Sequence, residues 1–74
     1  MDKTLLLKKF GKNVKIQRIK RDYTQEKLAQ IMDVSQNYIA GIERGKANMS
    51  LVKIYELANY LNVDIKVLVD FSED

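Results

Sequence analysis

A chain of 74 residues, 46% of them hydrophobic and none of them proline, is enough for one small domain of helices joined by short turns. Cysteine and histidine are both absent, which excludes disulfides, thiol nucleophiles, and the commonest zinc ligand and general base. The formal net charge is +3, with eight Lys or Arg against one acid in residues 1–21 and two against five in residues 50–74. We therefore expect no enzyme, metal site or cofactor, and the basic N-terminal part suits a polyanion, with an ordinary solvated helix face as the alternative.

The first predicted helix runs from about residue 4 to residue 21. Apolar residues recur at helical spacing along one stripe, which Arg18 continues: Leu7, Phe10 and Val14. Three more fall on roughly the opposite side: Leu5, Ile16 and Ile19. A helix with two apolar sides needs a second cover, from the C-terminal segment or from a partner chain, and we expect the C-terminal segment to supply it.

Two short helices follow, each preceded by a residue that can cap it. The side-chain oxygens of Thr24 and Ser35 can accept hydrogen bonds from free backbone N–H groups, which predicts helices over residues 25–32 and 36–43. Gly45 is a typical residue just past a helix end. The predicted inward residues of this pair of helices are Leu28, Ala29, Ile31, Val34, Ile39 and Ile42.

The last two predicted helices begin after Ser50 and after Asp64. Leu51, Ile54, Leu57, Ala58 and Leu61 repeat at helical spacing, and Asn62 suits the left-handed position at the helix end. The short final helix turns Ile65, Leu68 and Val69 inward. The sequence thus predicts a compact all-α fold of five helices, with residues 1–74 forming a single domain.

Residues 24–45 carry the functional signal. A cap, an eight-residue helix, a three-residue turn, a second cap, a second helix and a glycine follow one another within this segment. Helices this close in sequence must cross at a steep angle, and the small Ala29 would let their backbones approach. The start of the second helix then projects outward, where it can enter a DNA major groove about 12 Å wide. The segment predicts a helix-turn-helix motif.

The segments 23–29, 34–39 and 42–45 resemble the lambda-repressor and Cro type (XRE-like) helix-turn-helix family, and the likeness covers about residues 10–69. Members of that family are compact helical domains that bind operator DNA, usually as dimers on pseudo-palindromic sites. Within the family, the short chain and the stretches 38–44 and 48–51 are similar to restriction–modification controller proteins. Those are small dimeric regulators that both activate and repress their own operon.

The resemblance implies roles for particular residues. Gln36 and Asn37 match the start of the recognition helix, where either side chain can pair with adenine for about 1–3 kcal/mol of discrimination, and Tyr38 completes the base-reading set. Arg18 and Glu43 match a pair that fixes the end of that helix to the first helix. The resemblance assigns contacts with the DNA backbone to Thr24, Gln25, Ser35, Arg44 and Lys46. The alternatives are ordinary surface polar residues, a Tyr38 packed over the preceding helix, and a surface ion pair worth under about 1 kcal/mol.

The sequence departs from the family pattern at several positions. Asp22 and Asp33 stand in turns where the family usually has glycine, and aspartate tolerates the left-handed conformation better than most residues. Replacing either by glycine is therefore expected to leave stability unchanged or to improve it. Gly41 stands where many members carry a longer side chain, and either it allows a close approach to the groove or it costs about 1 kcal/mol relative to alanine.

We expect a DNA-binding transcriptional regulator that binds a pseudo-palindromic operator as a homodimer, since one such domain makes few base contacts. Residues that could form the dimer interface, or else complete the core of one chain, are Tyr55, Tyr60, Val63, Val67 and Phe71. RNA polymerase is a further partner if the protein is an activator, and no small-molecule effector is evident. The alternatives are a phage or mobile-element repressor, an antitoxin, or a protein-interaction module that no longer binds DNA. Neither a membrane span nor a secretory signal is visible in the sequence, so we expect a cytoplasmic location.

Overall fold

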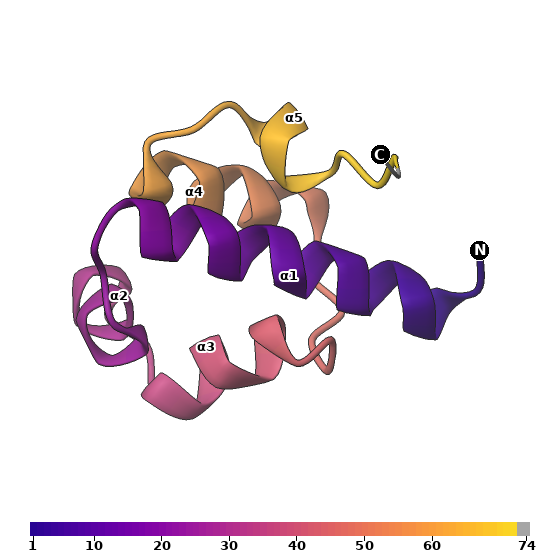
Figure 1. Cartoon of the computed structure of the whole chain (residues 1–74). Helices are drawn as coiled ribbons and strands as arrows, with labels where there is room; N and C mark the ends of the chain where they lie inside the picture. Colours follow the sequence, from indigo (N-terminus) through magenta and orange to yellow (C-terminus); the bar gives the residue numbers. More distant parts are fainter. Residues whose placement is uncertain (73–74) are drawn as a thin grey trace.

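The computed structural model describes residues 1–72, and these contain five helices and no strand. In chain order the helices are α1 (Lys3–Lys20), α2 (Gln25–Met32), α3 (Gln36–Glu43), α4 (Leu51–Leu61) and α5 (Ile65–Leu68) (Figure 1). The predicted all-α fold is confirmed, and each helix begins and ends within one or two residues of its predicted bounds. Of the predicted domain over residues 1–74, the last two residues lie outside the described part.

The long helix α1 runs through the middle of the molecule. In Figure 1, α4 and α5 lie on one side of it, and α2 and α3 lie on the other. Helix α1 packs against α3 and α5, while α2 packs against α3 and α4. The core residues from all five helices form a single cluster: Phe10, Val14, Leu28, Ala29, Ile39, Ile42, Leu57, Ala58, Leu61 and Leu68.

Every helix starts at a side chain that accepts a hydrogen bond from a backbone N–H of the first turn. The predicted caps Thr24, Ser35, Ser50 and Asp64 all do so, and so does Asp2, which had not been predicted as a cap. Each of these bonds satisfies a donor that the helix itself leaves without a partner. Three non-glycine residues adopt the left-handed conformation between helices: Asp22 (φ 59°), Asp33 (φ 57°) and Asn62 (φ 57°). The predicted left-handed turns are thus confirmed.

Three residues predicted to face inward lie at the surface. Leu51 is 71% exposed because it is the first residue of α4, and the contacts of this helix with the core begin only at Ile54; its neighbour Val52 is 67% exposed as well. Ile31 lies at the edge of α2, where Leu28 and Ala29 occupy the buried side. Val69 follows the end of α5, where helical spacing no longer sets the direction of its side chain.

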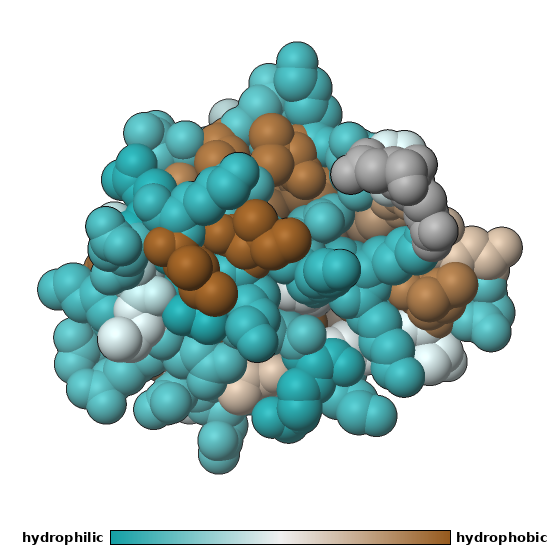
Figure 2. Space-filling model, viewed as in Figure 1, coloured by the Kyte–Doolittle hydropathy of each residue, from teal (hydrophilic) through white to brown (hydrophobic). Residues whose placement is uncertain are grey.

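The C-terminal segment covers only part of the second side of α1. The Asn13 amide donates hydrogen bonds to the carbonyl oxygens of Leu68 (3.0 Å) and Asp70 (2.9 Å), and so fixes the segment across the middle of the helix. Leu5 and Ile19, nearer the two ends, nevertheless remain 45% and 53% exposed. The expected cover is therefore incomplete, because the segment is short and its hydrogen bonds reach only Asn13 and Lys9, near the middle of α1. Figure 2, in the same orientation, shows apolar surface among the polar groups of this face.

None of the helices within residues 1–72 is both long enough and apolar enough to cross a bilayer.

Candidate nucleic-acid interface

The turn between α2 and α3 sets the angle at which the second helix leaves the core. Asp33 ends α2 in the left-handed conformation, and the backbone N–H of Val34 donates to the carbonyl oxygen of Ala29 at 3.0 Å. Ala29 is buried, and Val34 packs against the core. Ile39, which is fully buried, fixes the inner side of α3. The opposite side of α3 is consequently presented outward from its first residue.

The outward start of α3 carries the two carboxamides expected to read bases. Gln36 and Asn37 are both exposed. Neither side chain makes a hydrogen bond to any residue in the described range 1–72, so their donors and acceptors face solvent. Gly41, one turn further along, has open space around the position that a Cβ atom would take. This end of α3 can thus approach a base edge without first breaking an internal contact.

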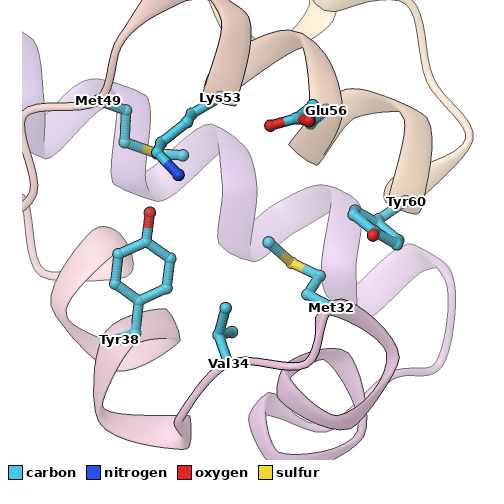
Figure 3. Close-up of a pocket in the computed structure, with 7 residues that line it drawn as sticks. All are labelled: Met32, Val34, Tyr38, Met49, Lys53, Glu56 and Tyr60. Atoms are coloured by element: carbon cyan, nitrogen blue, oxygen red, sulfur yellow. The ribbon is translucent and has the colours of Figure 1, made fainter.

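Tyr38 points in a different direction from this pair. It is half-buried and packs against the core, and its ring extends from α3 toward Met49 and Lys53 (Figure 3). There it lines a groove of about 500 Å³ between the α2–α3 turn and α4, together with Met32, Val34, Met49, Lys53, Glu56 and Tyr60. The ring therefore lies in the groove between α3 and α4, which Met32 of α2 also lines.

The other end of α3 is held by a buried charge network. Arg18 of α1 donates to Glu43 through Nε (2.6 Å to Oε2) and Nη2 (3.1 Å to Oε1), and their side chains are only 10% and 4% exposed. A third guanidinium hydrogen bond goes from Nη1 to the carbonyl oxygen of Tyr23 at 2.7 Å. Gln25, at the start of α2, donates its amide to Oε1 of Glu43 at 3.1 Å. A bidentate pair of this kind has a defined geometry, so it joins α1, α2 and α3 rigidly.

Backbone contact between α1 and the end of α3 adds to this network, and the sequence interpretation missed it. A Cβ atom at Gly11 would lie only 2.4 Å from the carbonyl oxygen of Ile42 and 2.6 Å from that of Glu43. Only glycine allows this approach. A glycine inside a predicted helix was the available signal, since such a residue often marks a packing requirement.

The expected backbone-contacting residues surround the exposed end of α3 or follow it. Thr24 Oγ1 and Ser35 Oγ each accept a capping hydrogen bond, and a hydroxyl in that role still has its own hydrogen to donate. Arg44 and Lys46 are exposed just after α3, and within residues 1–72 neither has an ion-pair partner. Gln25 uses its amide on Glu43 but is half-buried, so part of it still faces solvent.

The residues expected at a dimer interface fall into two groups. Tyr55 and Tyr60 of α4 are 56% and 42% exposed. Val63, Val67 and Phe71 are half-buried, and both Val63 and Phe71 pack against the core of their own chain. The most exposed apolar side chains of α4, Leu51 and Val52, were not among the candidates. Helical spacing alone had assigned Leu51 to the core.

A recognition helix with an exposed polar start and a rigidly braced end defines a helix-turn-helix DNA-binding domain. Residues 14–68 match the helix-turn-helix family, and the chain belongs to that family. It is accordingly a DNA-binding transcriptional regulator.

Two curated relatives and one solved structure are control or controller proteins. The chain is 42% identical over 64 residues to the control protein C.BamHI of Bacillus amyloliquefaciens, with 85% of this chain and 79% of the relative covered. It is 33% identical over 61 residues to the control protein C.MunI of a Mycoplasma species, with 81% and 82% covered. Its fold is similar to the restriction-modification controller protein C.AhdI of Aeromonas hydrophila, with a TM-score of 0.77, 37% identity, and 84% and 94% of the two chains covered.

Proposed function

We propose that this protein is a restriction–modification controller that binds a pseudo-palindromic operator as a homodimer and regulates transcription in the cytoplasm. The observation that carries the proposal is the contrast between the two ends of α3. The side chains of Gln36 and Asn37 are exposed and make no hydrogen bonds within the described chain, while the Glu43 side chain at the far end is buried and paired with Arg18. A rigid helix with free carboxamides at its start is what base reading in the major groove requires. The relatives named as control and controller proteins support the biological role.

Each predicted contact has a chemical role in this proposal. Gln36 and Asn37 read base edges, and Tyr38 contributes at the margin of the site through the part of its side chain that is exposed. The phosphate contacts come from residues on either side of α3 that can donate to an anion: Thr24, Gln25, Ser35, Arg44 and Lys46. Phosphate contacts set the position of the protein on the duplex, whereas the base contacts select the sequence.

A homodimer follows from the few bases that one α3 can reach. Two copies on half-sites about one helical turn apart reach the affinity that specific binding needs. The outer side of α4 offers the surface for this pairing, because Leu51, Val52 and Tyr55 lie there with exposures of 56–71%. Val63, Val67 and Phe71 would contribute at the edge of such an interface, since each is already half-buried.

The dimer is tested by sedimentation equilibrium on the wild type and two matched variants. Tyr55→Glu is expected to shift the protein to monomer, because a buried unpaired carboxylate is costly. Ile19→Glu places the same charge at an apolar residue of similar exposure on α1 and is expected to leave the dimer intact. A monomeric wild type, or dissociation by Ile19→Glu alone, would contradict this assignment.

Base reading is tested by selection from a random duplex library at near-physiological salt. The wild type is expected to enrich a palindromic site, and Gln36→Ala is expected to alter or lose it. Gln30→Ala removes an exposed glutamine near the end of α2 and serves as the matched control that keeps the wild-type site. Absence of enrichment with the wild type, with only general salt-sensitive binding, would favour a protein-interaction module instead. If transcription in vitro shows activation from the selected site, RNA polymerase is a further partner.

A further inference from the structure

Helix α1 begins well before the part of the chain that matches the helix-turn-helix family. The match starts at residue 14, whereas α1 starts at Lys3. The roughly three turns of α1 ahead of the match hold Lys8, whose side chain is exposed. In Figure 1 this end of α1 lies beside the loop that follows α3. A side chain on these first turns of α1 can therefore reach DNA that is bound by α3, although the match to the family does not include it.

Two backbone contacts fix this end of α1 against the end of α3. The first is at Gly11, which has no room for a Cβ atom beside the carbonyl groups of Ile42 and Glu43. The second is at Gly45, whose φ is +80° and where a Cβ atom would lie 2.9 Å from the Cα, N and Cγ atoms of Lys8. Lys8 therefore lies directly against the backbone of residue 45, and its position relative to α3 is fixed.

The neighbours of residue 45 in the chain are both cationic. Arg44 and Lys46 are exposed, so three positive side chains start from adjoining backbone positions. Within residues 1–72 none of the three forms an ion pair, and the nearby Glu43 is already engaged by Arg18 and Gln25. Side chains that start from adjoining positions can bring their like charges together, and an anion placed among those charges offsets their repulsion.

We propose that Lys8 is an additional DNA-backbone contact, which forms with Arg44 and Lys46 a three-cation clamp on a phosphate group at the edge of the operator half-site. The inference rests on the proposed function, because it places the clamp next to the recognition helix. Arg44 directly follows α3, so a duplex that receives the start of α3 in its major groove has its phosphates along this edge. The polyanion that binds the clamp is the DNA already in contact with α3. The clamp carries no sequence information, since every nucleotide presents the same phosphate.

The experiment measures affinity against salt concentration for four proteins, each on the selected operator and on an unrelated duplex. The proteins are the wild type, Lys8→Gln, Lys46→Gln and Lys12→Gln. Lys12 is the matched control, because it is an exposed lysine one turn further along α1 and lines a hollow beside Asp70 and Phe71, away from Gly45. Thermal melts of all four by circular dichroism verify that each variant is folded.

Lys8→Gln and Lys46→Gln are each expected to lower the slope of log K against log salt by about one, with roughly tenfold weaker binding at about 0.1 M salt. The weakening should be similar on both duplexes, and the selected sequence should not change. Lys12→Gln should keep the wild-type slope. A Lys8→Gln slope equal to that of the wild type, beside a reduced slope for Lys46→Gln, would overturn the clamp and leave the proposed function intact. A wild type that binds both duplexes equally, with Lys8 still contributing to the slope, would instead overturn operator recognition and keep the clamp.

Discussion

Gly11 and Gly41 both lie inside helices, yet replacing each by alanine is expected to change stability in opposite directions. Glycine within a helix costs about 0.5–1 kcal/mol relative to alanine, so both substitutions gain this amount from helix propensity. At Gly41 nothing lies within 4 Å of the new Cβ atom, and the gain remains whole. At Gly11 the Cβ atom would lie 2.4 Å from one backbone oxygen and 2.6 Å from another. Neither oxygen can rotate away, so α1 must move relative to α3.

The expected size of the loss at Gly11 follows from the cost of overpacking. Forcing atoms into a filled core costs typically about 1–3 kcal/mol, occasionally more, and the propensity gain offsets at most about 1 kcal/mol of it. Because the clashing atoms at Gly11 are backbone oxygens, its cost lies at the upper end of this range, and the net loss is about 2 kcal/mol in a domain whose total stability is roughly 4–11 kcal/mol. At roughly 4–8 °C per kcal/mol, Gly11→Ala should melt about 8–16 °C lower, and Gly41→Ala about 2–8 °C higher, than the wild type.

Urea and thermal unfolding followed by far-UV circular dichroism measure both effects on the same instrument. The two variants share the same chemical change, so a difference in sign isolates the steric contact between α1 and α3. A Gly11→Ala protein as stable as the wild type would refute the close approach of the two backbones. It would also remove one of the two contacts that fix Lys8 beside the recognition helix.

Three further outcomes are expected. Arg18→Met should lower the free energy of unfolding in urea by about 3–5 kcal/mol, because the Glu43 carboxylate stays buried without its cation. A loss under about 1 kcal/mol would mean that the pair behaves as an exposed ion pair. Asp33→Gly should keep the melting temperature or raise it by up to about 8 °C, since glycine adopts φ near +57° without steric cost, and a clear fall would contradict this account of the turn. Hydrogen bonds from the Ser72 side chain and backbone lower the pKa of Asp70 below its ordinary value of 3.8. They stabilise the fold at neutral pH, where Asp70 is charged, and this stabilisation is lost as the pH falls through the folded pKa. Ser72→Ala should return the Asp70 pKa toward 3.8 in an NMR titration, and an unchanged pKa would argue against the hydrogen bonds.

The sequence predicted those features that depend on a few neighbouring residues. The caps Thr24 and Ser35 bond to N–H groups three residues ahead, so their role can be recognised locally. The left-handed Asp33 was predicted because the resemblance to the family placed a glycine position there. Leu51 shows the limit of such reasoning, since it has the spacing of a core residue but lies ahead of Ile54, where α4 first packs against the core, and is 71% exposed.

The sequence by itself determined which segments become helices, where they begin and end, and which residues at the start of α3 are polar. Only the tertiary structure decided how those helices cross, and the crossing determined the rest. Because the side chains of Arg18 and Glu43 are buried, they form a desolvated ion pair that holds the end of α3, instead of a surface pair. The absence of a Cβ atom at Gly11 lets the backbone of α1 touch the end of α3. Local patterns record which side of a helix is apolar, but contact between distant segments depends on the packing of the whole chain.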